Sequence, residues 1–100
     1  MAKRVSLSVN DVPIQLDEFV EGYVYHIVSG IIASLKGTGE IENLELSIDN
    51  EEQVTITLNG ADVPIKYFPN EIIRSTIFGM VSMLKGVREV DRLQLIVTTE

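Results

Sequence analysis

The sequence predicts an α+β fold: an internal duplication of a β-β-α-β unit that builds a six-stranded, mainly antiparallel sheet with two helices packed on one face. Three observations lead to it. The chain matches itself when shifted by 49 residues, each half begins with alternating apolar and polar residues, and a longer helical pattern follows in each half. The length of 100 residues is that of one ordinary domain. We therefore expect residues 1–100 to form a single domain of two pseudo-symmetric repeats, at about 4–48 and 53–98.

The repeat needs no gap in the alignment. A shift of 49 pairs the tripeptide Leu-Lys-Gly at 35–37 with that at 84–86. It also pairs Val5 with Val54, Asn10 with Asn59, Phe19 with Phe68, Gly30 with Gly79, and Leu46 with Leu95. A local rival shift of 51 matches Asp-Val-Pro-Ile at 11–14 with 62–65. The two shifts differ by two residues, so both assign the strand residues to the same faces of the sheet.

Each unit starts with a predicted β-hairpin, because alternating residues flank a two-residue turn signal. The turns are Asn10-Asp11 and Asn59-Gly60, and the second is among the strongest short hairpin signals. On the second strand of each hairpin the alternation predicts an inward face made of Val12, Ile14 and Leu16, and of Ala61, Val63 and Ile65. A proline accompanies each of these strands, which places them at sheet edges or bulges because proline cannot donate to a ladder.

A helix is predicted to follow each hairpin and to run to Leu-Lys-Gly. Asp17 is a favourable N-cap, and Pro69 suits a first helical turn. At the other end, lysine complements the helix dipole and glycine suits the C-cap. We expect the apolar stripes to cover the sheet; they are Val20, Val24, Ile27, Val28, Ile31 and Leu35, and Ile73, Ile77, Met80, Val81 and Leu84. A third strand closes each unit, from Leu44 and from Leu93.

An interlocked six-stranded barrel of the double-psi kind is the alternative architecture for a duplicated β-β-α-β unit. Such barrels typically carry a shorter helix and a Gly-Asp box before the third strand. Neither feature occurs in this sequence, so we favour the open sheet.

Composition and charge argue against several classes of protein. The net charge of −7 disfavours nucleic-acid binding. The absence of cysteine excludes disulfides and Cys-ligated zinc and is typical of a cytoplasmic protein. The N-terminal alternation indicates a strand rather than a signal peptide. The most apolar stretch, 19–35, contains Glu21 and His26, so we expect an amphipathic helix and no membrane association.

The first candidate site lies on the helix faces opposite the apolar stripes. Small residues and the lone histidine gather there: Gly22, His26, Gly30 and Ala33 in the first helix, and Ser75, Gly79 and Ser82 in the second. A glycine inside a helix costs about 0.5–1 kcal/mol relative to alanine, yet both copies keep one at the matching position. We interpret this as a close helix–helix contact, within one chain or between two chains. The alternative is inheritance from one ancestral unit without a present role.

His26 is the only histidine and cannot form a multi-histidine metal site. General-base chemistry would need a nearby carboxylate, but Glu21 and Glu18 lie five and eight residues away instead of three or four. We therefore expect a packed or interface histidine. The sequence predicts no catalytic, cofactor-binding or metal-binding residues.

The second candidate site is electrostatic. Residues 1–52 contain ten acids and three bases, whereas residues 53–100 contain five of each. This split predicts that the acidic half of one chain docks on the more basic half of another; the residues concerned are Glu40, Glu42, Glu45, Lys85, Arg88 and Arg92. The acids near 49–52 lack the ligand spacing of an EF-hand loop, so we expect a solvated turn there.

Two hypotheses for the function follow. The first is a small, acidic, non-enzymatic interaction or structural protein that self-associates as a homo-oligomer, with a dimer as the first expectation. The second is a small-molecule binding protein or an enzyme with its site between the two repeats, near His26. No cofactor is predicted, and the sequence does not identify a ligand.

Overall fold

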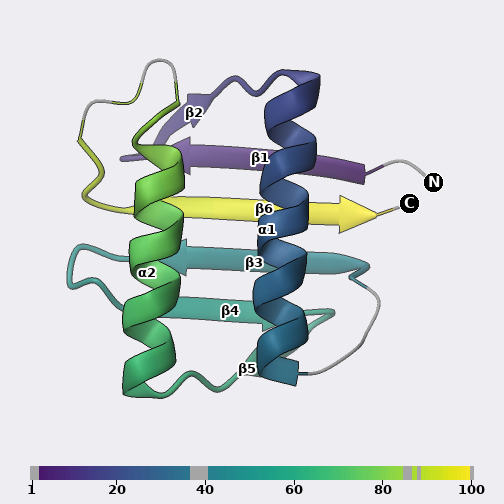
Figure 1. The fold of residues 1–100 in the computed structure, drawn as a ribbon, viewed down its shortest axis with the longest axis vertical. Helices are drawn as coiled ribbons and strands as arrows, with labels where there is room; N and C mark the ends of the chain where they lie inside the picture. Colours follow the sequence, from purple (N-terminus) through teal and green to yellow (C-terminus); the bar gives the residue numbers. More distant parts are fainter. Residues whose placement is uncertain (1–2, 37–40, 85–86, 88, 100) are drawn as a thin grey trace.

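The computed structural model describes residues 3–36, 41–84, 87 and 89–99. The elements are β1 (Lys3–Val9), β2 (Val12–Ile14), α1 (Glu18–Lys36), β3 (Asn43–Ile48), β4 (Val54–Leu58), β5 (Ala61–Val63), α2 (Tyr67–Val81) and β6 (Leu93–Thr99). They form a six-stranded sheet with both helices over one face (Figure 1). The predicted α+β fold class is confirmed.

The strand order is β2-β1-β6-β3-β4-β5, and every neighbouring pair is antiparallel. The last strand, β6, lies in the middle of the sheet between β1 and β3. Because β2 and β5 are edge strands, the sheet is open, and the structure does not support the alternative of an interlocked barrel.

The register of the two central strands is symmetric. Leu46 lies opposite Leu95, which is its counterpart under the 49-residue shift. Under the same shift Glu45 corresponds to Gln94 and Ser47 to Ile96, so the flanking pair Glu45–Ile96 corresponds to the other flanking pair, Ser47–Gln94. A pseudo-two-fold axis therefore passes through the sheet between the two leucines. This symmetry agrees with the repeat, while duplication from one ancestral unit stays a prediction.

Both hairpin turns adopt the left-handed backbone that a two-residue turn requires. The φ angles are 52° and 67° at Asn10 and Asp11, and 50° and 85° at Asn59 and Gly60. The strands that follow these turns are the two edges of the sheet, as the prolines predict. Val12 lies opposite the buried Val9, so it is on the predicted inner face, but its side chain is 57% exposed beside a hollow at the edge of the sheet.

The core lies between the sheet and the helices. The helical residues at its centre are Val24, Val28 and Ile32 of α1, and Ile73, Ile77 and Val81 of α2. All of them except Ile32 belong to the predicted stripes. They pack on the central strands, where Leu44, Leu46, Leu95 and Val97 are buried.

The two helices end differently. α1 continues to Lys36, as predicted, but α2 stops at Val81, before the second Leu-Lys-Gly. The reason is a change of hydrogen bonding: the amides of Met83 and Leu84 donate to the carbonyls of Met80 and Val81, three residues back, so the last turn tightens. The predicted glycine C-caps at 37 and 86 lie outside the described residues.

One side chain in the first turns of each helix anchors a strand. Glu21 accepts a hydrogen bond from the amide of Val5 (2.9 Å), and Asn70 accepts one from the amide of Val54 (2.8 Å). Glu21 and Asn70 are counterparts under the 49-residue shift, as are the two valines. The N-cap at Asp17 is confirmed, because its carboxylate accepts from the amide of Val20 (2.8 Å).

Candidate interaction surface

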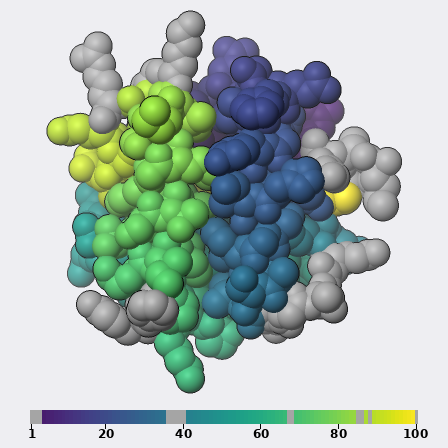
Figure 2. Space-filling view, viewed as in Figure 1, coloured from purple at the N-terminus to yellow at the C-terminus, as the bar shows by residue number. Residues whose placement is uncertain are grey.

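The outer face of the helix layer is exposed and carries few charges. α1 and α2 lie side by side and fill the centre of this face (Figure 2). Acids occur in the first turn of α1, and Glu71 and Arg74 occur near the start of α2. From Gly22 to Leu35 and from Ser75 to Leu84 the sequence contains no Asp, Glu, Lys or Arg. We call the exposed residues of these two ranges the helix face.

The small residues predicted as a packing site all lie on this side of the helices. Gly30, Ala33, Ser75, Gly79 and Ser82 are exposed, and Gly22 is half-buried. A Cβ atom added at any of the three glycines would meet no described atom within 4 Å. The proposed close contact between the two helices of one chain is therefore not present in the described structure. The contact between two chains stays a prediction.

His26 stands in the middle of the exposed side of α1. Its Nδ1 lies 2.8 Å from the carbonyl oxygen of Gly22. A carbonyl only accepts, so Nδ1 is the protonated nitrogen. The ring meets Tyr25 edge-on, with centroids 5.5 Å apart. His26 lines neither the hollow beside β2 nor the hollow on the other face of the sheet, both described below.

Large apolar side chains border the helix face at the start of α1 and the end of α2. Phe19 is 77% exposed and stacks on Tyr23 at 6.0 Å, and Met83 is 85% exposed. Nearby, a hollow of about 680 Å³ opens between β2, the start of α1 and Leu84. The sequence analysis did not identify these residues as a site. Their positions outside the apolar stripes could have indicated that these large apolar side chains are exposed.

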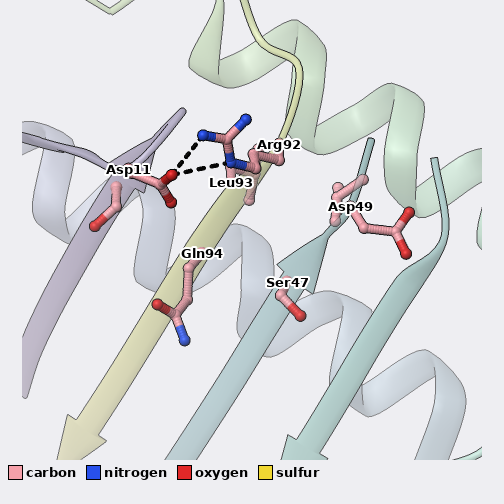
Figure 3. Close-up of a pocket in the computed structure, with 8 residues that line it drawn as sticks. Asp11, Ser47, Asp49, Arg92, Leu93 and Gln94 are labelled. Atoms are coloured by element: carbon pink, nitrogen blue, oxygen red, sulfur yellow. Dashed lines mark hydrogen bonds and ion pairs between the residues drawn. The ribbon is translucent and has the colours of Figure 1, made fainter. Parts of the chain in front are cut away.

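The other face of the sheet has no helix over it, and its side chains are mostly short and polar. A shallow hollow of about 360 Å³ lies at one end of this face (Figure 3). Arg92 donates to the carboxylate of Asp11 through both Nε and Nη2. This hydrogen bond, and then the positive charge of Arg92, lower the pKa of Asp11, and the carboxylate in turn raises the pKa of Arg92. In Figure 3 the carboxylate of Asp49 points away from the pair.

Of the predicted electrostatic residues, the structure describes Glu42, Glu45 and Arg92. Glu42 and Glu45 are exposed on and beside β3, whereas Arg92 pairs with Asp11, which sequence reasoning used only as a turn residue. Glu40, Lys85 and Arg88 lie outside the described residues. The pairing was hard to foresee because 81 residues separate Asp11 from Arg92 in the chain.

Among the described residues, no group of His, Asp or Glu side chains is arranged to hold a metal ion. No helix in the described ranges is long and apolar enough to cross a membrane. The described geometry offers surfaces for contact instead of converging catalytic groups.

No protein-family model, curated protein or solved structure matches this chain.

Proposed function

We propose that this protein is a small, non-enzymatic interaction protein that self-associates through the helix face, with a dimer as its first assembly. The observation that carries the proposal is the absence of charged residues from an exposed surface in a chain of net charge −7. Charged residues are depleted at the cores of protein interfaces, whereas ordinary surface helices carry them on the solvent side.

A second copy of the chain is the partner that this surface fits. Two copies with the same net negative charge repel each other, so they can approach closely only where each lacks acids. The pseudo-two-fold symmetry of the chain places similar small residues on both helices, and a self-complementary contact between identical patches is the usual form of a dimer interface. The exposed glycines, beside which the described chain leaves open space, would let helices of two chains approach.

The whole helix layer, of which the helix face is the central part, is large enough for a modest dimer. Helices of 19 and 15 residues are about 28 and 22 Å long at 1.5 Å per residue, and two adjacent helices cover a width of about 20 Å. Each copy therefore offers about 500 Å², and a dimer would bury about 1,000 Å² in total, at the lower end of specific interfaces. The exposed side chains of Phe19 and Met83 would contribute apolar contacts to this area.

The test is sedimentation velocity with light scattering on the wild type and three variants. We expect a wild-type dimer that dissociates in Gly30→Arg and in Ser75→Arg, because each buries an unpaired charge. Thr55→Arg, which adds the same charge on the exposed side of β4 away from the helices, is the matched control and should stay dimeric. A wild type with the mass of one chain at about 100 μM, or a dimer unaffected by both helix-face variants, would refute the proposal.

Salt concentration separates this proposal from docking between acidic and basic halves. Association through an uncharged face should be unchanged or stronger at 1 M NaCl, because salt screens the repulsion between like net charges. Docking of opposite charges should weaken at the same salt concentration.

The alternative function, a small-molecule site near His26, has less support because His26 lies outside the described hollows. The expected absence of nucleic-acid and membrane partners, and the cytoplasmic location, stay predictions.

A further inference from the structure

The two halves of the chain interlock, and neither half contains a continuous sheet. In the first half, β1 and β3 do not touch each other because β6 lies between them. In the second half, β4 and β6 are separated in the same way by β3. Each half thus contributes a hairpin and a single strand, and the two meet only through strands of the other half.

Reciprocal side-chain contacts join the halves at matching positions. The Asn10 side-chain oxygen accepts hydrogen bonds from the amides of Asp91 and Arg92, at 2.9 and 3.0 Å. The Asn59 side-chain oxygen accepts from the amides of Glu42 and Asn43, both at 2.9 Å. Each hairpin turn therefore holds the start of the central strand that belongs to the other half.

The only covalent link between the halves is a strained turn. In the segment 49–53, which we call the hinge, the amide of Glu52 donates to the carbonyl of Asp49 (2.9 Å) and the amide of Asp49 donates to the carbonyl of Gln53 (3.2 Å). This is a three-residue hairpin loop, whose last residue is left-handed and favours glycine. Here that residue is Glu52, with φ 66°. The hinge also concentrates three acids, Asp49, Glu51 and Glu52.

We propose that, when the chain folds at high concentration, a second copy fits the interface between the halves, so that two chains exchange halves and form an interlocked dimer distinct from the helix-face association. The hinge opens, and β3 with β4 becomes one long strand that pairs antiparallel with the same strand of the partner. Each of the two sheets then contains the first half of one chain and the second half of the other. Short, strained hinge loops favour this exchange, because opening relieves the backbone strain at Glu52.

Charge determines which halves combine. Residues 1–48 carry a net charge of −4, the hinge carries −3, and residues 54–100 are neutral. A sheet made from two first halves would therefore be repelled. The ion pair between Asp11 and Arg92 also exists only when a first half meets a second half, because the counterparts of these residues are Gly60 and Asn43. Exchange therefore preserves the contacts of the single chain.

The first test removes residues 50–53 in the Gly30→Arg background, which prevents association through the helix face. Only Asp49 then separates Ile48 from Val54, and the tightest common hairpin loop needs two residues. We expect a folded dimer with twice the mass of one chain and an unchanged circular dichroism spectrum. A folded single chain would overturn the proposal.

The second test does not depend on the shortened hinge. Asp11→Arg and Arg92→Asp, each in the Gly30→Arg background, are unfolded together and refolded at about 1 mM. Exchange between the two variants restores both ion pairs, so native mass spectrometry should show more mixed dimer than the half expected from random pairing. Each variant refolded alone should give less dimer. Refolding to single chains only, or random proportions of the dimers, would sink the idea.

Discussion

Glu52→Gly is expected to stabilise the protein, although it removes a side chain that makes an ion pair. A residue other than glycine pays about 1–2 kcal/mol for a left-handed backbone, and Glu52 has φ 66°. Glycine offsets about 0.4–1 kcal/mol of this gain in stability, because a chain with glycine has more conformational freedom when it is unfolded. The pair between Glu52 and Arg74 is long, at 3.7 Å, and half-exposed, so its loss costs a few tenths of a kcal/mol. The net gain in unfolding free energy is about 0.5–1 kcal/mol.

Urea denaturation followed by circular dichroism measures this gain, and the melting temperature should rise by about 2–8 °C. Glu52→Ala is the matched control, because it removes the same charge and the same ion pair but keeps a Cβ atom at the left-handed position. Glu51→Gly tests whether any glycine in the hinge has the same effect, and we expect it to be neutral or destabilising. If Glu52→Gly is no more stable than Glu52→Ala, backbone strain at this position is not significant and the reasoning fails.

Two further predictions concern buried and exposed polar groups. Asn70→Ala should lower the unfolding free energy by about 2–3 kcal/mol in urea titrations. The reason is that the amide of Val54 and the carbonyl of Glu52 lose buried partners. The control Asn50→Ala, in the exposed hinge, should change the unfolding free energy by less than about 0.5 kcal/mol. Asp11→Asn should destabilise the protein at pH 6, and the destabilisation should shrink as the pH is lowered below the unfolded pKa of Asp11. The folded-state pKa of Asp11 is lowered, so its contribution is present above the unfolded value of about 3.9 and is lost as the pH falls through the folded value. A stability difference between wild type and Asp11→Asn that does not depend on pH would contradict this.

Local chemistry explains most of what could be read from the sequence. The Asn59-Gly60 turn and the N-cap at Asp17 depend on residues that are neighbours in the chain, and both formed as expected. Strands and helices each have a residue spacing that is the same in every fold, so the alternation and the stripes predicted most of the core residues. Prediction was weaker at the margins, where Val12 is exposed because no neighbouring element covers it.

Long-range pairing explains what could not be read. The carboxylate of Glu21 accepts a hydrogen bond from the amide of Val5, and no pattern within the helix indicates that strand. Arg92 was expected to contribute to docking between chains, and within the chain its carboxylate partner is Asp11. Both contacts follow from which strands become neighbours.

The sequence by itself determined the type of each element, the repeat and the uncharged character of the helix face, because these properties belong to consecutive or periodically spaced residues. The tertiary structure alone decided that the sheet is open, that β6 lies between β1 and β3, and that each hairpin turn holds a strand of the other half. These outcomes depend on the energy of packing two similar units together, and identical local patterns are compatible with more than one such arrangement.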